Sequence, residues 1–241
     1  MFRDVAGRRT MRVHVGEQAY FVKLHEGIGW GEVIKNWLQL KAPIVGASNE
    51  YLACEGLAAE DIDAPRVAAF AEQDTVLPRR RSFVLLDELA GYEDLETLGH
   101  RWLEAMPDGL TKHRYLRAVA QFARRFHEAG FVHRDFYICH LLVHQSQRQA
   151  PQRLAVLDLH RARRFAQLPQ RWRLRDLAAL LFSTLDLGYS RRDWLRFVRW
   201  YTGQPLAQAD WPFWGAVLAR AERLYKEGQK KGIVAGRYTG S

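Results

Sequence analysis

At 241 residues, with 48% hydrophobic and 26% charged side chains, the chain has the composition of an ordinary globular protein and is long enough for one large core or two smaller lobes. No apolar run approaches the roughly 20 residues that a membrane-spanning helix needs, and MFRDVAGRRT lacks the apolar segment of a signal peptide, so we expect a cytoplasmic protein. The formal net charge of +9 favours an anionic partner, either nucleic acid, an acidic membrane surface or a multiply charged small substrate.

The first part of the chain has the pattern of short β-strands. MRVHV at 11–15 and AYFVKL at 19–24 are strand-type runs, and the intervening GEQ is a plausible hairpin turn. FRDV, which precedes a turn in AGRR, adds another strand. After a connector that includes two tryptophans, Ser48 or Asn49 is placed to cap a helix through EYLACEGLAAE. SFVLLDELAG, at 82–91, is predicted to be a buried strand that leads into a turn.

Helices are predicted to dominate the rest of the chain. Between 111 and 129 the apolar side chains recur on one face at helical spacing, and Gly130 is placed to end that helix. HLLVH and RLAVLDL are predicted to be two short strands. DLAALLFSTLDLG, which begins at Asp176, is apolar on nearly every side, and this predicts a helix buried all round. Residues 191–231 are predicted to be helical as well.

The two cysteines predict neither a metal site nor a disulfide framework. Cys54 and Cys139 lie far apart in the sequence and have no metal-ligand spacing. We therefore expect two reduced, buried thiols. The order of the predicted strands and helices indicates an α+β protein with a small β-rich first part and a larger, mainly helical second part.

FVHRDFYICHLLV, Phe131–Val143, places three charged or titratable side chains between two apolar runs. Burying His133, Arg134 and Asp135 costs free energy unless each side chain is paired with a partner or serves a functional role. They can form a salt-bridged loop, or they can present a catalytic aspartate that its neighbours orient. The tripeptide alone does not decide between these interpretations.

Four residues in order along the chain favour the catalytic interpretation. Lys23 lies in a predicted strand, Glu50 near the start of a helix, Asp135 in the loop just described, and Asp158 at the end of a short strand. This is the order found in protein-kinase-like phosphotransferases. Phosphoryl transfer needs a lysine for the nucleotide phosphates, a base for the acceptor hydroxyl and a carboxylate for magnesium. The alternative is that Lys23 and Glu50 form only a structural ion pair.

Three departures from protein kinases favour a small-molecule kinase over a regulated protein kinase. His140 stands where the catalytic loop usually carries a metal-binding Asn, and imidazole is a poor magnesium ligand, so His140 either binds metal weakly or shapes the site. Asp158-Leu159-His160 replaces Asp-Phe-Gly, which removes a glycine hinge. AGRRT, ahead of the second strand, offers one glycine and two arginines able to reach phosphate in place of a glycine-rich loop.

Five segments carry a more specific likeness. They are YFVKLHEGIGWGEVIKNW, PIVGASNEY, FVHRDFYICHLLV, LAVLDLHRARR and RWRLRDLAALLFS, and they lie between Tyr20 and Ser183. These segments, with His140 and Asp158-Leu159-His160, resemble the lipopolysaccharide core heptose kinases of Gram-negative bacteria (the WaaP/RfaP type). The resemblance implies a two-lobed protein-kinase-like fold, with an N-lobe at 1–90 and a C-lobe at 91–241. It also implies ATP-dependent phosphorylation of an inner-core heptose on the cytoplasmic side of the inner membrane.

The resemblance also implies roles for residues in the second part of the chain. Asp135 would be the catalytic base and Asp158 the main Mg²⁺ ligand, with His140 as a candidate second ligand. Asp176 matches the position that braces the catalytic loop in kinases, although it could instead be only a helix N-cap.

On the nucleotide side, the resemblance assigns ATP contacts to four residues. Lys23 would contact the α- and β-phosphates, with Glu50 as its partner. The backbone around Glu88 and Leu89 would receive the adenine.

The implied acceptor, lipid A-core lipopolysaccharide, carries carboxylates and phosphates. Arginines that follow Asp158 suit such a polyanion, because guanidinium groups bind carboxylate and phosphate in bidentate geometry. We expect Arg161 and Arg164 to contact it, and a solvated arginine-rich loop is the alternative. The full set of arginines in this segment is Arg161, Arg163, Arg164, Arg171, Arg173 and Arg175.

The C-terminal segment allows peripheral contact with the inner membrane. Trp211, Phe213 and Trp214, with the basic residues that follow, could rest on an anionic bilayer. The alternative is a core-facing stripe that includes Trp214 and Ala221 at helical spacing.

Other functions stay open at this stage. The acceptor could be Kdo or another sugar, or a protein. The chain could also be a kinase-fold scaffold without transfer activity, against which the intact Asp135 and Asp158 argue. A nucleic-acid-binding protein is disfavoured, because no recognised binding motif is present.

Overall fold

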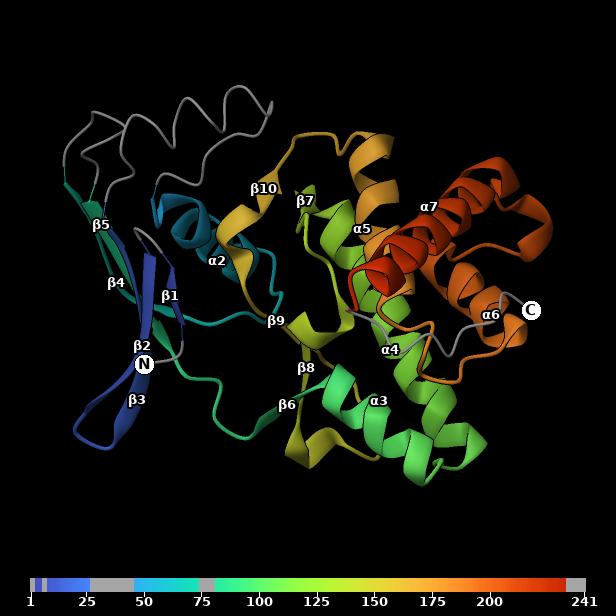
Figure 1. The fold of residues 1–241 in the computed structure, drawn as a ribbon, viewed down its shortest axis with the longest axis horizontal. Coiled ribbons are helices and arrows are strands. Elements are labelled where there is room, and N and C mark those ends of the chain that lie inside the picture. The colour runs from blue at the N-terminus through green and yellow to red at the C-terminus, as the bar shows by residue number, and fades with distance from the viewer. Residues whose placement is uncertain (1–2, 6–7, 27–45, 74–80, 233–241) are drawn as a thin grey trace. The chain divides into compact units, whose positions relative to one another are not determined.

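The computed structural model describes residues 3–5, 8–26, 46–73 and 81–232, and the chain divides into two compact units (Figure 1). Unit 1 comprises Met1–Ala90 and Asp158–Ala162, and unit 2 comprises Gly91–Leu157 and Arg163–Ser241. The sequence led us to expect Asp158 in the second part of the chain, but its segment groups with unit 1. Most of the predicted connector after the first hairpin lies outside the described residues.

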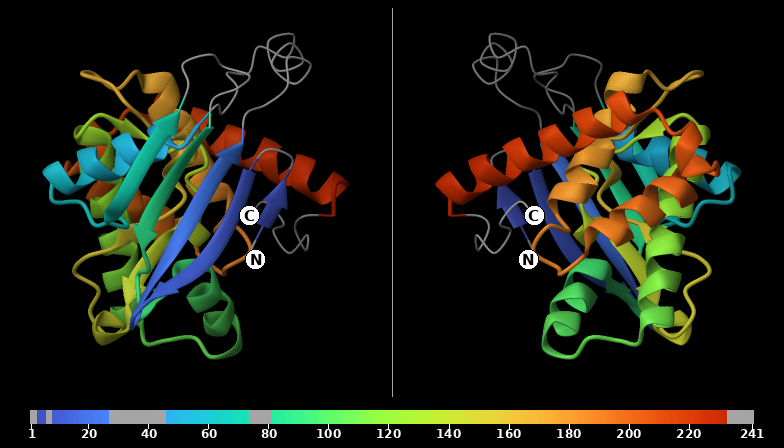
Figure 2. Two further views of the ribbon diagram at one scale, coloured as in Figure 1. Left: turned by 90° about the vertical axis from the view of Figure 1, so that its left-hand side faces the viewer. Right: turned by 90° about the vertical axis from the view of Figure 1, so that its right-hand side faces the viewer.

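Unit 1 is built on a five-stranded antiparallel sheet in the order β1-β2-β3-β5-β4, which Figure 2 shows nearly face-on. The predicted hairpin is confirmed: Gly16, with a φ of 61°, and Glu17 form the turn, and Val15 pairs with Gln18. A positive φ favours glycine at this position. The strands are β1 (Arg3–Val5), β2 (Arg8–Val15), β3 (Gln18–Glu26), β4 (Val67–Gln73) and β5 (Arg81–Asp87).

The two arginines that we expected in a turn able to reach phosphate are strand residues. Arg8 and Arg9 lie in β2 and pair with His25 and Leu24 of β3. That part of the expected turn is wrong, because the strand pairing of β2 begins earlier than its apolar run. The glycine of AGRRT lies outside the described residues.

Helix α2 (Ser48–Ala59) packs against β4 and β5 on one face of the sheet (Figures 1 and 2). Tyr51 of the helix stacks on Phe70 of β4 with ring centroids 4.4 Å apart. The helix is as predicted, but its expected cap is wrong. Ser48 is already helical, the N-cap position is Ala47 without a side-chain cap, and the N–H of Ala47 donates to Ser82 Oγ at 2.8 Å.

Unit 2 is mainly helical, so the described chain is a mixed α and β structure with a small sheet-rich N-terminal part, as the sequence predicts (Figure 1). Its short strands form a pair, β10-β7, and a three-stranded sheet, β6-β8-β9. The strands are β6 (Tyr92–Asp94), β7 (Phe131–Val132), β8 (Leu141–His144), β9 (Ala155–Val156) and β10 (Arg163–Arg164). The helices are α3 (Leu95–Glu104), α4 (Gly109–Glu128), α5 (Gln170–Phe182), α6 (Arg191–Thr202) and α7 (Trp211–Lys230).

An aromatic cluster forms part of the core of unit 2. Phe126 of α4 stacks on Phe122 and on Phe136, with ring centroids 6.1 and 5.5 Å apart, and contacts Phe131 at 5.7 Å. Phe126 is fully buried, and burying such a side chain contributes about 1.5–3 kcal/mol. The predicted end of α4 is confirmed, because Gly130 follows it with a φ of 85°. The cluster thereby anchors the loop that begins at Phe131.

Helix α5 starts earlier and ends earlier than the apolar run predicted. It begins after Pro169, which occupies the N-cap position, and ends at Phe182. Proline favours the start of a helix and disrupts its interior, so the arginine-rich turn after Pro169 becomes helical. At the other end, Ser183 Oγ donates to the carbonyl of Leu180 at 2.8 Å. The end of the apolar run therefore folds into turns.

The buried face of α7 is formed by the stripe of residues that the sequence offered as the core-facing alternative. Trp214, Ala221 and Tyr225 are buried, whereas Trp211 is 42% exposed. For Trp214, which had been a candidate for membrane contact, the core-facing alternative is the right one. Among the described residues no helix is both long and apolar enough to cross a membrane.

Only one of the two cysteines is a buried thiol. Both are free, but Cys54 is buried in α2 and Cys139 is partly exposed. Burial, and then the nearby Glu50 carboxylate, raises the pKa of the Cys54 thiol to about 12.

The start of α6 is fixed by a reciprocal capping box. Ser190 Oγ accepts from the Asp193 N–H, the Ser190 N–H donates to Asp193 Oδ2, and Lys112 Nζ of α4 donates to the same oxygen at 2.8 Å. Burial opposes ionisation of Asp193. The hydrogen bonds from Lys112 and Ser190 outweigh it and hold the pKa of Asp193 at about 2.

We predict that Asp193→Asn lowers the free energy of unfolding by about 1–2 kcal/mol at pH 7. Because the folded-state pKa lies below the ordinary value of 3.8, the stabilisation is present above about pH 4 and is lost as the pH falls toward 2. Urea denaturation of both proteins from pH 7 to pH 2 measures it. A difference between the two that stays constant over this range would contradict the assignment.

Candidate functional site

In unit 1, one lysine lies between two carboxylates. Lys23 Nζ of β3 is 2.5 Å from Glu50 Oε1 of α2 and 3.3 Å from Asp158 Oδ1. The side chain of Glu50 is 2% exposed and that of Lys23 is 12% exposed. The ion pair between Lys23 and Glu50 that the sequence predicted is therefore present, and Asp158 joins it.

Asp158 has an uncommon backbone conformation. Its φ of 59° and ψ of 52° lie in the left-handed region, which non-glycine residues adopt rarely, although aspartate tolerates it better than most. His160 Nδ1 lies 2.7 Å from Asp158 Oδ1, and the short turn Leu159–Arg161 packs against α2. These contacts hold the carboxylate beside Lys23.

The residues that follow β5, Glu88 and Leu89, carry backbone N–H and C=O groups just beyond the end of that strand. The Glu88 N–H donates to the carbonyl of Ala19 at 3.1 Å, and the Glu88 carboxylate forms a salt bridge with Arg12 at 2.6 Å. Within the described part of the chain, the N–H and C=O of Leu89 have no hydrogen-bond partner. Of the two residues expected near adenine, Leu89 is the one with backbone groups available.

In unit 2, the loop after β7 is held by its own side chains. The carbonyl of Asp135 accepts from the Tyr137 N–H at 2.9 Å and lies 2.7 Å from His140 Nδ1. A carbonyl only accepts, so Nδ1 of His140 carries a proton. His133 Nε2 lies 2.8 Å from the carbonyl of Leu157, and the His133 and His140 rings stack at 5.2 Å. Both histidines therefore shape the loop.

Asp176 braces the backbone of this loop. Its side chain is fully buried, and its two oxygens accept from the N–H groups of His133 at 2.7 Å and Arg134 at 2.9 Å. Arg134 has a φ of 74°, a conformation that costs about 1–2 kcal/mol for a non-glycine residue. The alternative that Asp176 is only a helix N-cap is wrong, because Pro169 occupies that position and Asp176 lies inside α5.

Three further contacts near the loop were not expected from the sequence. Ser183, at the end of α5, accepts from the Ile138 N–H at 2.9 Å, so α5 holds the loop at two points. His127 of α4 lies 3.5 Å from Asp176 Oδ2 and 2.9 Å from the Tyr201 hydroxyl. No local sequence pattern indicates these pairs, since their members come from different elements.

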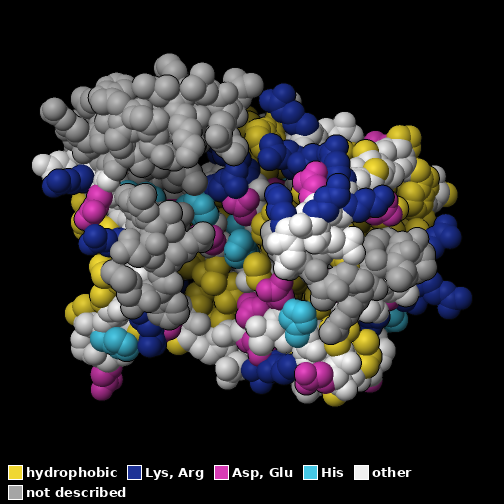
Figure 3. Space-filling model, in the orientation of Figure 1, with side chains coloured by type: hydrophobic (Ala, Val, Ile, Leu, Met, Phe, Trp, Pro, Cys, Tyr) yellow, Lys and Arg dark blue, Asp and Glu magenta, His cyan; other side chains and the backbone are white. Residues whose placement is uncertain are grey.

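The two arginines expected to bind the substrate belong to different units. Arg161 lies in the turn of unit 1 and is partly exposed. Arg164 lies in β10 of unit 2, where its Nε donates to the carbonyl of Ala129 and its guanidinium is 5.1 Å from the Phe131 ring centre. Figure 3 shows a separate group of basic side chains over α5 and α7.

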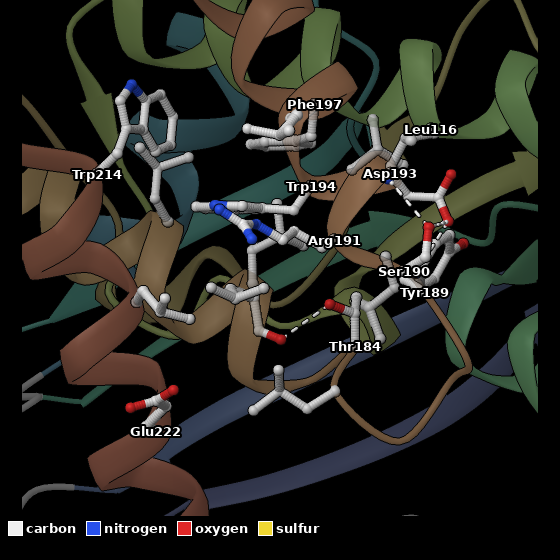
Figure 4. Close-up of a pocket in the computed structure, with 18 of the residues that line it drawn as sticks. Leu116, Thr184, Tyr189, Ser190, Arg191, Asp193, Trp194, Phe197, Trp214 and Glu222 are labelled. Atoms are coloured by element: carbon white, nitrogen blue, oxygen red, sulfur yellow. Dashed lines mark hydrogen bonds between the residues drawn. The ribbon is translucent and has the colours of Figure 1, made fainter. Parts of the chain in front are cut away.

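Unit 2 also contains an apolar cavity of about 490 Å³. Figure 4 shows Trp194 and Phe197 of α6, Trp214 of α7 and Leu116 of α4 around it, with Asp193 and Ser190 at one margin. Trp194 and Trp214 meet edge to face at 5.4 Å. The sequence signal was the abundance of tryptophan after residue 190, but the cavity depends on residues from four helices and is not predictable from any one of them.

The donor atoms near Asp158 fit a magnesium site that a nucleotide completes. In the part of the chain that the structure describes, no group of three or more His, Cys, Asp or Glu side chains could hold a metal ion alone. Mg²⁺ usually binds through one or two carboxylates together with substrate phosphates and water. The Asp158 carboxylate suits this mode of binding, whereas Nδ1 of His140 is engaged with the Asp135 carbonyl.

In unit 1 a lysine is held by a glutamate with a second carboxylate beside it, and in unit 2 a braced loop carries Asp135. Phosphoryl transfer requires groups of these types, so the residues of the two units fit a kinase. The chain belongs to the Lipopolysaccharide kinase (Kdo/WaaP) family, whose sequence model matches residues 1–201.

Similar proteins with known names cover most of the chain. It is 41% identical to the lipopolysaccharide core heptose(I) kinase WaaP of Pseudomonas aeruginosa, over 96% of this chain and 88% of that protein. It is 35% identical to the protein of the same name from Escherichia coli K12, over 97% of this chain and 90% of that protein. A solved structure titled "WaaP in complex with acyl carrier protein" matches with a TM-score of 0.78 and 36% identity, over 93% of this chain and 88% of that one.

We predict that Asp176→Ala lowers the free energy of unfolding by about 2–5 kcal/mol, because it leaves two buried N–H groups without acceptors. Asp176→Asn should cost less, since one amide oxygen still accepts. Asp210→Ala, which removes an exposed helix cap, is the control and should cost about 1 kcal/mol. Urea denaturation followed by tryptophan fluorescence measures all three, and equal losses for Asp176→Ala and Asp210→Ala would show that the brace contributes little.

Proposed function

We propose that this chain is an ATP-dependent kinase that phosphorylates a heptose hydroxyl of the lipopolysaccharide inner core. The observation that carries the proposal is the placement of Lys23 between Glu50 and Asp158 in a chain similar to named heptose(I) kinases along most of its length. The lysine and its two carboxylates support phosphoryl transfer as the reaction. The names of the similar proteins support heptose as the acceptor.

The proposal includes a two-lobed protein-kinase-like fold. Residues 1–90 form the N-lobe, with the sheet and α2, and residues 91–241 form the helical C-lobe. Asp158–Ala162 is the exception to this division, because it groups with unit 1, where Asp158 lies beside Lys23 of the sheet.

On the nucleotide side, the ammonium group of Lys23 binds the α- and β-phosphates of ATP. Glu50 holds the lysine in place from the buried face of α2. The backbone N–H and C=O of Leu89 are the groups that receive the adenine edge. Glu88 contributes mainly by its salt bridge to Arg12, since its N–H already donates to Ala19 and its carbonyl already accepts from the Ala90 N–H.

Asp158 is the residue that would hold magnesium. When bound, Mg²⁺ would neutralise charge on the β- and γ-phosphates. The left-handed conformation of Asp158 and its contact with His160 orient the carboxylate for this role. His140 acts by shaping the loop, which the bond from its Nδ1 to the Asp135 carbonyl supports over metal binding.

Asp135 is the catalytic base. Its carboxylate accepts the proton of the heptose hydroxyl as the hydroxyl oxygen bonds to the γ-phosphorus, and the bond from that phosphorus to the bridging oxygen breaks to release ADP. The hydrogen bonds to the Asp135 carbonyl and the brace from Asp176 fix the backbone from which the carboxylate extends.

The acceptor is lipid A-core lipopolysaccharide, which the chain meets at the cytoplasmic face of the inner membrane. Arg161 and Arg164 are proposed to contact its anionic groups. The exposed Trp211 and the basic residues of α7 are candidates for peripheral contact with the bilayer.

A Kdo sugar is the alternative acceptor, because the family description includes Kdo kinases. The names of the relatives favour heptose over Kdo and over a protein acceptor. The presence of both Asp135 and Asp158 in the sequence argues against a scaffold without activity.

An acyl carrier protein is a second proposed partner. The similar solved structure is titled as a complex with this protein. The apolar cavity between α4, α5, α6 and α7 has the volume and lining to take an acyl chain.

We predict that Asp135→Asn lowers kcat for phosphorylation of core oligosaccharide by about 10²–10⁴-fold and leaves the KM for ATP nearly unchanged. Asp158→Asn should lower kcat and also raise the KM for ATP. ADP release with and without acceptor measures both, and Glu17→Gln, in the exposed hairpin turn, is the charge-removal control. Wild-type kcat in Asp135→Asn would remove Asp135 from the mechanism.

A further inference from the structure

Arginines gather around one tryptophan near the start of α5. The guanidinium carbons of Arg175, Arg134 and Arg171 lie 4.9, 5.3 and 5.9 Å from the centre of the Trp172 ring. Phe165 stacks against Trp172 at 6.5 Å. Cation–π contacts of this kind hold guanidinium groups in place without neutralising them. The charges of Arg171 and Arg175 therefore stay available to a ligand.

Helix α7, which packs against α5, adds further arginines to the same region. Nε of Arg220 on α7 is buried and has no hydrogen-bond partner in the described chain. Arg171, Arg175 and Arg223 likewise form no salt bridge with any carboxylate that the structure describes. A buried donor without an acceptor costs about 1–3 kcal/mol, so these groups favour an added acceptor.

Some of these arginines lie close enough for their positive charges to repel one another. The pKa of the Arg220 guanidinium is lowered, first by burial and then by Arg175 and Arg223. Glu227 and Tyr137 oppose the shift but do not cancel it. Asp176 is the acid inside α5, and both its oxygens are engaged by the loop backbone. The arginines therefore lack a full set of counter-charges from the chain.

The group lies beside the loop that carries the proposed base. Arg134, which contacts Trp172, immediately precedes Asp135, and Tyr137, which influences Arg220, follows two residues later. Arg175 immediately precedes Asp176, which braces the loop. All of these residues belong to unit 2. An anion bound here would lie beside the loop that carries Asp135.

We propose that Arg171 and Arg175, held around Trp172, form with Arg220 of the adjoining helix α7 an oxyanion site that binds a phosphate or carboxylate group of the acceptor. This inference rests on the proposed function and names the chemical group that positions the acceptor. It places the anion contact on α5 and α7, apart from the expected Arg161 and Arg164. A solvated basic surface is the simpler explanation for exposed Arg171 and Arg223, but it does not account for the buried donor on Arg220.

The experiment compares Arg175→Gln and Arg220→Gln with wild type and with Arg192→Gln, an exposed arginine of α6 outside the group. Steady-state kinetics give the KM for ATP and for two acceptors, lipid A-core lipopolysaccharide and the same material after chemical dephosphorylation. Thermal unfolding of each protein with and without inorganic phosphate measures anion binding independently of catalysis.

We expect each variant in the group to raise the KM for lipopolysaccharide by about tenfold and to leave the KM for ATP unchanged. An effect that disappears with the dephosphorylated acceptor identifies phosphate as the ligand, and an effect that remains identifies carboxylate. Inorganic phosphate should raise the Tm of wild type and of Arg192→Gln by more than that of the two variants. Without phosphate, Arg220→Gln should be at least as stable as wild type, because it relieves repulsion, and this separates lost binding from misfolding.

Several results would overturn the proposal. They are an unchanged acceptor KM in both variants, a matching rise in the KM for ATP, or equal stabilisation of all four proteins by phosphate. Loss of acyl carrier protein binding with an unchanged acceptor KM would assign the arginines to that partner instead. If wild type phosphorylates no heptose, the proposed function fails, while the phosphate-dependent Tm still tests the oxyanion site.

Discussion

One buried carboxylate fixes the part of unit 2 on which the proposed chemistry depends. Asp176 accepts from two consecutive backbone N–H groups, and this holds Arg134 in a left-handed conformation that the residue would otherwise avoid. The direction in which the Asp135 side chain leaves the loop follows from that backbone. The helix that carries Asp176 also carries Trp172 and Arg175, so the proposed base and the proposed oxyanion site depend on the same helix.

Unit 1 reaches a defined geometry by a different route. The register of β3 between β2 and β5 sets the position of Lys23, and the packing of α2 on the sheet brings Glu50 to it. The short turn after Asp158 packs on the same helix, which brings a residue distant in sequence beside the lysine. The replacement of a glycine hinge by Leu159 and His160 suits this arrangement. Leu159 is buried and His160 contacts Asp158, so the segment is held in place in a way that fits a kinase without a switching loop.

The sequence predicted the parts of this molecule that local patterns encode. The β2–β3 hairpin, helix α4 with its terminal Gly130 and the ion pair of Lys23 with Glu50 follow from turn chemistry, periodicity and motif order. Strand β4, VAAFAEQ, was missed because alanine, glutamate and glutamine have low strand propensity and only pairing with β5 makes it a strand. The role of His140 depends on the proximity of its ring to a carbonyl five residues earlier. The contact of Arg134 with Trp172 depends on how the loop after β7 meets α5. Tertiary packing decides these features.

The central claim, that the chain transfers a phosphoryl group from ATP to a heptose of the inner core, is tested most directly by the structure of the product. Purified chain, ATP, magnesium and core oligosaccharide are incubated, and the sugar is analysed by mass spectrometry and ³¹P NMR. The account predicts one added phosphate monoester on a heptose ring with wild type and none with Asp135→Asn. A phosphate on Kdo would contradict the assigned acceptor, and ATP hydrolysis without any phosphorylated sugar would contradict the kinase mechanism itself.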